Sequence, residues 1–246
     1  MPRIYLSPST QEYNSYITGA GSEEYFMNLL ADAMEPYLLA TTIRFTRNTP
    51  DMTAASSIRQ ANSGSYDFYL ALHSNASTDG SREGTVRGVI AFYYPGSANG
   101  KRAAGIFVRN LKDVYPLPDK VYASATTALG EVRQPYMPSV LLELGYHDNT
   151  ADALWVENNL EAIAANLVLS LTEYFGLPFV VPLTPWRGTV RTRGGPLNLR
   201  TAPALNGAVA AAMPDGAPVT VYGRYQDWYT VGYNGLLGYA FAEYIT

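Results

Sequence analysis

The sequence predicts a layered α/β/α domain with a mostly parallel central sheet, followed by a small all-β domain. Up to about residue 176, short apolar runs of strand length alternate with segments of helical periodicity. From residue 187 onward, short β-like runs alternate with glycine turns, which is typical of a small barrel. The segment between them is rich in proline, which predicts a stiff linker. We therefore expect a first domain over 1–176, a linker over 177–186 and a barrel over 187–246.

Local patterns place the elements of the first domain. Ser22 is a good helix N-cap, and Glu23 and Glu24 fall in the first turn that follows it. Pro36 lies inside the same helical pattern, so we expect that helix to kink or end there. Gly176 ends the last helix of the domain. The expected strands cover residues 4–6, 43–45, 66–72, 86–94 and 140–142, and the expected helices cover about 22–38, 51–62 and 99–115. A cap is expected over 149–152, with a long amphipathic helix after it that runs to Phe175, and a loop is expected over 77–83.

Composition excludes several classes of function. The chain has no cysteine, which rules out disulfides, thiolate metal sites and cysteine catalysis. Its net charge of -4 provides no electrostatic footprint for nucleic acid. No apolar run is long enough to span a membrane. Only His73 and His147 are available for histidine chemistry.

Polar side chains follow two of the buried strands at their carboxyl ends. The run Val140–Leu142 ends in Glu143, and the strand before Leu72 ends in His73, Ser74 and Asn75. A glutamate at the end of a buried strand is costly unless it has a partner or a proton. Because open α/β sheets bind their ligands beyond the carboxyl ends of the strands, we expect the functional site there.

An ordered set of motifs strengthens this expectation. The set consists of Glu23 at a helix start, Phe45–Arg47, Arg59–Asn62, Leu70–Ala76 and Met137–Tyr146. On these residues the first domain resembles the zinc-dependent N-acetylmuramoyl-L-alanine amidases, which cut bacterial peptidoglycan between muramic acid and the stem peptide. In that family a histidine after the first strand, a helix-opening glutamate and a histidine of the third strand bind Zn2+. A glutamate of the last strand is catalytic. The resemblance thus implies that Glu23 and His73 are zinc ligands and that Glu143 is the catalytic residue.

The chain departs from this pattern at the first zinc-binding histidine. The corresponding loop runs from Ser7 to Gln11 and contains no histidine, so that Thr10 or Gln11 stands in its place. His147, four residues beyond Glu143, is our expected replacement as the third ligand. Gln11 is the alternative, as a weak ligand or as a group that hydrogen-bonds the substrate.

Two further residues are candidates for substrate contact. Asn75 follows His73 at the strand end, and Arg133 could bind a substrate carboxylate. A salt bridge from Arg133 to Glu131 or Glu143 is an equally good reading.

The tail resembles a bacterial SH3-like wall-binding domain. The matching segments are Gly188–Arg191, Leu197–Pro203, Gly216–Val221, Trp228–Val231 and Gly238–Phe241. Such a domain would hold an enzyme on its insoluble substrate and so raise the effective concentration. Trp228, Tyr229 and Tyr239 are the candidates for a wall-binding face, although Trp228 fits the barrel core equally well.

Together these resemblances predict an enzyme that hydrolyses the amide bond between N-acetylmuramic acid and L-alanine in bacterial peptidoglycan, with Zn2+ as cofactor. It would act at the bacterial cell wall. The first residues enter a strand without a signal-peptide pattern, so we expect phage-lysin-like release or a leader that has been removed. Two alternatives are a catalytically inactive wall-binding protein, and a zinc peptidase that cuts within the stem peptide.

Overall fold

The computed structural model of the chain describes residues 1–78 and 82–246, so the expected loop over 77–83 lies partly outside the described residues. The chain divides into two compact units. One contains Arg3–Met34 and Phe45–Tyr174, and the other contains Met1–Pro2, Glu35–Arg44 and Phe175–Thr246. Among the described helices, none has the length and apolar character needed to cross a membrane.

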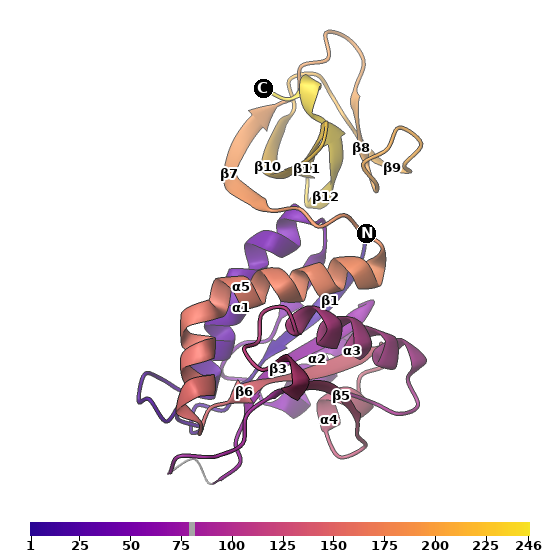
Figure 1. The fold of residues 1–246 in the computed structure, drawn as a ribbon. Coiled ribbons are helices and arrows are strands. Elements are labelled where there is room, and N and C mark those ends of the chain that lie inside the picture. Colours follow the sequence, from indigo (N-terminus) through magenta and orange to yellow (C-terminus); the bar gives the residue numbers. More distant parts are fainter. Residues whose placement is uncertain (79–81) are drawn as a thin grey trace. The chain divides into compact units, whose positions relative to one another are not determined.

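A six-stranded sheet organises the larger unit (Figure 1). Its strands are β1 (Arg3–Pro8), β2 (Arg44–Arg47), β3 (Phe68–Asn75), β4 (Val89–Tyr93), β5 (Val121–Ala125) and β6 (Ser139–Tyr146), in the spatial order β2-β1-β3-β6-β4-β5. β3 runs parallel to both β1 and β6, and β4 runs parallel to β5 but antiparallel to β6. The expectation of a mostly parallel sheet is therefore confirmed.

The helices that lie wholly or mostly in this unit are α1 (Glu23–Ala40), α2 (Ala54–Ser63), α3 (Ala98–Leu111), α4 (Gly130–Arg133) and α5 (Thr150–Phe175). Ser22 caps α1 as expected, because its hydroxyl accepts a hydrogen bond from the amide of Tyr25 at 3.2 Å. α1 does not end at Pro36 but continues to Ala40. The buried side chains of Leu38 and Ala40 explain the continuation, since ending the helix at the proline would leave their apolar surface unpacked.

Side chains two residues apart along each strand point to the same face of the sheet. On one face Tyr5, Tyr69 and Leu141 form a buried cluster with side chains of α2 and α4. On the other face Phe68 contacts Phe107 of α3 and Tyr174 of α5, with ring centroids 6.4 and 5.0 Å away. Helices therefore cover both faces, which confirms the α/β/α layers.

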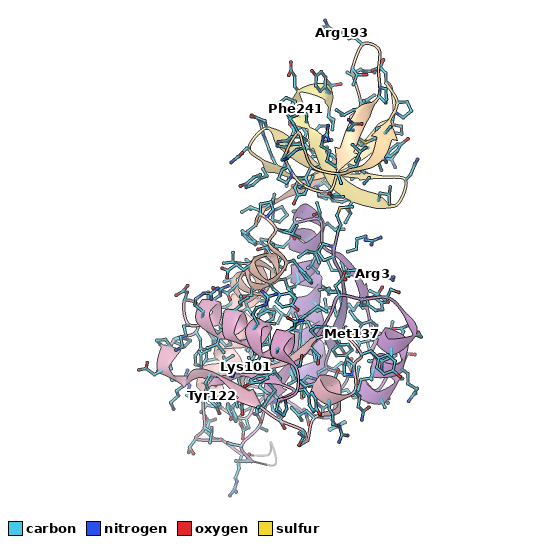
Figure 2. All side chains as sticks on the ribbon, turned by 90° about the vertical axis from the view of Figure 1, so that its right-hand side faces the viewer. Arg3, Lys101, Tyr122, Met137, Arg193 and Phe241 are labelled. Atoms are coloured by element: carbon cyan, nitrogen blue, oxygen red, sulfur yellow. The ribbon has the colours of Figure 1, made fainter. Side chains whose placement is uncertain are left out.

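The segment Leu117–Met137 contains three elements that periodicity does not reveal: a short 3-10 helix (Pro118–Lys120), β5 and α4. β5 alternates too weakly to stand out, because only Val121 among its residues is buried. Tyr122, labelled in Figure 2, is 49% exposed on this edge strand. α4 is only four residues long, which is too short for a helical repeat to appear.

The smaller unit holds an antiparallel six-stranded sheet. Its strands are β7 (Pro182–Thr189), β8 (Leu197–Arg200), β9 (Val209–Met213), β10 (Pro218–Tyr225), β11 (Trp228–Tyr233) and β12 (Leu236–Phe241), in the order β7-β10-β11-β12-β8-β9. Val190, Leu199, Val221 and Val231 lie fully buried in its core. β7 begins at Pro182, inside the segment expected as a linker. Proline is tolerated there because β7 is an edge strand that pairs only with β10.

Candidate functional site

One face of the central sheet carries polar side chains at the carboxyl ends of three strands. Ser7, His73 and Glu143 each lie two residues beyond a buried member of the apolar cluster on that face, so their side chains continue the same face. β3 and β6 pair in a register that makes His73 and Glu143 direct partners. The structure thus brings together the two strand-end residues that the sequence singled out.

His73 is held between two carboxylates. Its Nδ1 lies 2.8 Å from Oε1 of Glu23 at the start of α1, and its Nε2 lies 2.8 Å from Oε2 of Glu131 in α4. The ring is buried, which by itself would lower its pKa. Hydrogen bonds and charge from Glu131 and Glu23 outweigh that effect and hold the pKa of His73 well above the usual value.

Glu23 points into the site, as the register of α1 predicts. Its carboxylate is buried and also accepts a hydrogen bond from Nδ2 of Asn14 at 2.6 Å. Burial would raise the pKa of Glu23, but the hydrogen bonds from His73 and Asn14 lower it below the usual value. Glu24, the next residue of the same helical turn, is half-buried and has no such contacts among the described residues. Glu23, rather than Glu24, therefore faces His73, and its role as a zinc ligand stays a prediction.

Glu131 is a site residue that sequence reasoning missed. It is buried, and its Oε1 accepts hydrogen bonds from the hydroxyls of Ser7 at 2.8 Å and Tyr69 at 2.7 Å. These donors and His73 together overcome the cost of burial and lower the pKa of Glu131. The available signal was an acidic residue within the segment that borders the strand ends.

Gln11, in the loop after β1, lies close to both Glu23 and His73. Its Nε2 lies 3.4 Å from Oε1 of Glu23 and 3.4 Å from Nδ1 of His73. Its Oε1 accepts a hydrogen bond from the hydroxyl of Tyr13 at 3.1 Å. The ends of three side chains, Gln11, Glu23 and His73, therefore converge on one point.

Glu143 differs from the other two acids because it lacks a partner. Its Oε2 is buried and has no hydrogen-bond partner within the described part of the chain. Burial raises the pKa of Glu143 to about 7; the charge of His73 lowers it, and those of Glu23 and Glu131 raise it further. Arg133 does not neutralise it: this side chain is exposed, and the described residues include no ion pair between the two. A role of Arg133 toward the substrate stays a prediction.

His147 is not gathered with Glu23 and His73. Its Nδ1 lies 3.0 Å from the carbonyl oxygen of Ser74 and 3.2 Å from the Ser74 hydroxyl, and its ring stacks on Tyr16 with centroids 5.8 Å apart. Across residues 1–78 and 82–246, no three His, Cys, Asp or Glu side chains are grouped to hold a metal ion. The expected ligand set of Glu23, His73 and His147 is thus not assembled in this structure.

Asn75 shapes the turn beside His147. Its Oδ1 accepts a hydrogen bond from the amide of Ala76 at 2.8 Å, and its carbonyl accepts one from the amide of His147 at 2.8 Å. These are local structural roles, and a contact of Asn75 with substrate stays a prediction.

A cavity of about 350 Å³ opens onto the site. Its walls are the loop after β1, the start of α2, and the side chains of His73 and Glu131. Thr10, Gln11 and Tyr13 are among the loop residues that line it. A ligand can therefore reach the point where Gln11 and His73 meet.

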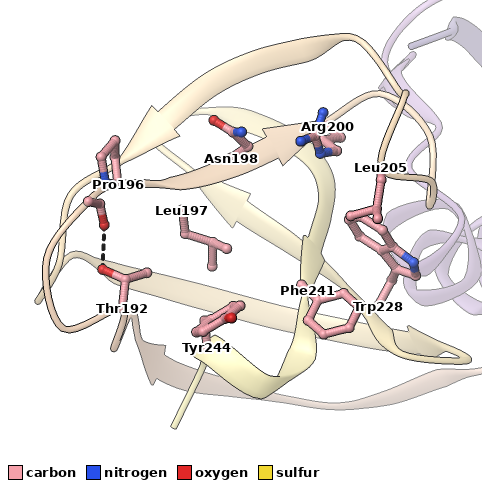
Figure 3. A pocket seen from close by; sticks show the side chains of 10 residues that line it. Thr192, Pro196, Leu197, Asn198, Arg200, Leu205, Trp228, Phe241 and Tyr244 are labelled. Carbon is pink, nitrogen blue, oxygen red and sulfur yellow. Dashed lines mark hydrogen bonds between the residues drawn. The ribbon is translucent and has the colours of Figure 1, made fainter.

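The smaller unit carries a second cavity, of about 470 Å³ (Figure 3). Trp228 and Phe241 line it edge to face, with ring centroids 5.4 Å apart, and Leu205 and Tyr244 line it too. Only 7% of Trp228 is exposed, so the residue contributes to the cavity wall and to packing at once.

Two other aromatic residues were expected on a wall-binding face. Tyr239 is completely buried, and its hydroxyl accepts a hydrogen bond from that of Thr42 at 3.4 Å. The expectation of an exposed Tyr239 is therefore wrong: its position on β12 turns it inward. Tyr229 is half-buried, contacts Trp186 edge to face, and lies outside the cavity.

The α/β/α fold places a buried histidine between two carboxylates at the strand ends. Residues 10–173 match the N-acetylmuramoyl-L-alanine amidase family, and the chain belongs to that family. Residues 195–246 match the bacterial SH3 domain. A search of curated proteins finds no significant match.

Solved structures share the fold of the first domain. The catalytic domain of CwlV, an amidase from Bacillus (Paenibacillus) polymyxa var. colistinus, has a TM-score of 0.62 at 17% identity, covering 72% of this chain and 100% of that one. AmiC2 of Nostoc punctiforme has a TM-score of 0.62 at 13% identity, covering 71% and 97%. The catalytic domain of the CD27L endolysin, which targets Clostridia difficile, has a TM-score of 0.55 at 20% identity, covering 70% and 98%.

Proposed function

We propose that this chain hydrolyses the amide bond between N-acetylmuramic acid and L-alanine in bacterial peptidoglycan. The observation that carries the proposal is Glu143, whose pKa of about 7 and unpartnered oxygen lie beside His73. Carboxyl groups with such raised pKa values are suited to move protons near neutral pH. Membership in the amidase family supplies the substrate class.

We extend the proposal to Zn2+ as the cofactor, with Glu23 and His73 as two of its ligands. Support comes from the surroundings of His73: Nδ1 faces Glu23, while Nε2 faces the carboxylate of Glu131. Metal-binding histidines commonly give their second ring nitrogen to a carboxylate in this way, which fixes the tautomer and the ring orientation. When bound, zinc would polarise the scissile carbonyl and activate a water molecule.

The other steps fall to the side chains of this chain. Glu143 accepts the proton of the attacking water and returns it to the amine that leaves. Ser7 and Tyr69 fix Glu131 by hydrogen bonds, and Glu131 in turn fixes the ring of His73. The cavity of about 350 Å³ at the site would receive the muramoyl-peptide substrate.

The SH3-like domain would hold the enzyme on the wall, and its action would then lie outside the cell. The cavity lined by Trp228 and Leu205 is the candidate contact, since apolar and aromatic walls with a few polar groups are typical of ligand sites. Leu205 is 78% exposed, so Leu205→Ala should weaken sedimentation with insoluble peptidoglycan without unfolding the domain. Leu183→Ala, on β7 outside the cavity, is the matched control. Equal sedimentation of both variants and wild type would reject this contact.

A second candidate function is wall binding without catalysis. The observation in its favour is that, in the described part of the chain, no three His, Cys, Asp or Glu side chains are grouped so that they could hold a metal ion. Under this alternative the chain would grip peptidoglycan through its SH3-like domain and release no product.

Mass spectrometry of digested peptidoglycan separates these candidates. The proposed function predicts free stem peptides with a new N-terminal alanine, which should disappear with a chelator and in Glu143→Gln. Binding without any new product, in the presence of added zinc, would establish the second candidate. Fragments cut within the stem peptide would show a peptidase and overturn the proposal.

A further inference from the structure

We propose that the side-chain oxygen of Gln11 is the third protein ligand of the metal ion, in place of an imidazole. This inference rests on the proposed function, because it assumes that Glu23 and His73 bind zinc. It assigns a metal-binding role to a glutamine, a residue type that zinc sites rarely use.

The first support is the geometry of three side-chain ends. The distances are 2.8 Å between Nδ1 of His73 and Oε1 of Glu23, and 3.4 Å from each of these atoms to Nε2 of Gln11. Ligand atoms at 2.0–2.1 Å from a tetrahedral zinc ion lie about 3.3 Å from one another. The two 3.4 Å edges match this separation, whereas the 2.8 Å edge between His73 and Glu23 would have to lengthen by about 0.5 Å to admit the ion.

The second support is the freedom of the Gln11 amide to turn. Without a cation, Nε2 faces the carboxylate of Glu23 and the oxygen faces the hydroxyl of Tyr13. A half-turn of the amide exchanges the two ends. Because a phenol can either donate or accept a hydrogen bond, Tyr13 can pair with the amide in both orientations. The oxygen of Gln11 can thus turn toward a cation without losing its partner.

The competing residues are less well placed. His147 is buried, and its Nδ1 is engaged by Ser74, whose carbonyl oxygen and hydroxyl lie 3.0 and 3.2 Å away. No hydrogen bond joins His147 to Glu23 or His73 among the described residues. Thr10 lines the same cavity as Gln11, but no hydrogen bond joins it to Glu23 or His73 among the described residues. Gln11 alone reaches both expected ligands from the loop that follows β1.

A glutamine ligand has a measurable consequence. An amide oxygen is a weaker and harder donor to zinc than an imidazole nitrogen. We therefore expect the chain to bind zinc less tightly than a variant that carries Gln11→His, and to discriminate less strongly between zinc and manganese.

The test is a zinc titration of the full chain, stripped of metal, in competition with a chromophoric chelator. Gln11→Ala should raise the zinc Kd about tenfold or more, and Gln11→His should lower it by a similar factor. Gln134→Ala is the matched control, because that glutamine is exposed and lies outside the site. His147→Ala should keep the wild-type Kd. Circular dichroism of each variant checks that it is folded.

The outcomes separate this inference from the proposed function. If wild type binds zinc and Gln11→Ala binds it equally well, Gln11 is not a ligand, although the zinc site stands. If His147→Ala loses zinc while Gln11→Ala keeps it, the third ligand is His147 and the inference is overturned. If neither wild type nor Gln11→His binds zinc, then the zinc-dependent function itself fails.

Discussion

His73 and Glu143 are register partners on the neighbouring parallel strands β3 and β6. His73 has a carboxylate on each ring nitrogen, whereas Glu143 has a buried oxygen with no hydrogen-bond partner among the described residues. The sheet therefore sets a fully bonded imidazole beside an unsatisfied acid. The ring of His73 is therefore fixed by its two carboxylate partners, whereas the buried oxygen of Glu143 has no partner to hold it in one protonation state.

Replacing Glu143 by glutamine should strongly reduce the rate of hydrolysis, because it removes the titratable group while keeping the size and shape of the side chain. A general acid–base residue contributes about 10²–10⁴-fold to rate, so Glu143→Gln should lower kcat by at least about 10²-fold. Release of soluble fragments from purified peptidoglycan measures the effect. Sedimentation with intact peptidoglycan should be unchanged, which controls for folding. Activity within a few-fold of wild type would show that Glu143 is not the proton carrier.

The rate should depend on the ionisation of Glu143. As a base the carboxyl must be deprotonated, so kcat/KM should rise with pH and reach half its plateau near the pKa of about 7. A soluble muramyl peptide, assayed between about pH 5 and pH 9, gives the profile. An acid limb that falls near the ordinary glutamate pKa of about 4.3 would contradict the raised pKa.

The same residue should make stability depend on pH. Since the folded pKa of Glu143 lies above the unfolded value, the folded state holds this proton more tightly, and stability is lost as pH rises through that interval. Glutamine does not titrate. We compare the free energy of unfolding of Glu143→Gln with that of wild type. The difference should shift in favour of the variant by about 1–3 kcal/mol between pH 4 and pH 8. Calorimetry at both pH values tests this, and an equal difference at each would count against it.

Glu131→Gln should change the tautomer of His73 and weaken zinc binding without abolishing it. The glutamine oxygen can replace the carboxylate toward Ser7 and Tyr69, but its NH₂ group would then face Nε2 of His73. The ring would have to accept there and carry its proton on Nδ1, the nitrogen that faces Glu23. Zinc affinity should fall about 10–100-fold in a competition titration. Tyr69→Phe, which keeps the contact between Glu131 and His73, should cost clearly less; equal losses would argue against a tautomer effect.

Gly145 lies near the carboxyl end of β6, and alanine should not fit there. Its φ is +78°, and an added Cβ would lie 3.2 Å from Cβ of Asp152. Gly145→Ala should therefore destabilise the domain by about 1–2 kcal/mol in urea unfolding. Gly105→Ala in α3, where an added Cβ meets nothing within 4 Å, should instead stabilise by about 0.5–1 kcal/mol. A similar shift in both variants would mean that backbone strain at Gly145 is unimportant.

Part of the site follows from the sequence by simple rules. His73 and Glu143 each end an apolar run, and parallel strands bring such ends to one edge of a sheet. The helical period of α1 also selects Glu23, because the buried Phe26 and Met27 fix which side of the helix faces inward. These placements depend on periodicity alone, and the structure has them as expected.

The rest depends on tertiary contacts that no period encodes. Glu131 meets Ser7 across 124 positions of the chain, from a helix of four residues. Gln11 lies in a loop, where side-chain direction has no repeat to reveal it. Tyr239 is buried on β12 and Trp228 is nearly so. Residue type alone does not predict this, because aromatic residues suit both a core and a binding surface.

Hydrolysis in water enriched in ¹⁸O tests the central claim most directly. If Glu143 and the site around His73 cleave the muramoyl amide, one ¹⁸O atom enters the carboxyl group of muramic acid, and the released peptide begins with unlabelled alanine. Mass spectrometry of the two products should show this pattern for wild type and nothing above background for Glu143→Gln. Label in a carboxyl group of the stem peptide, or no label in any product, would contradict the account.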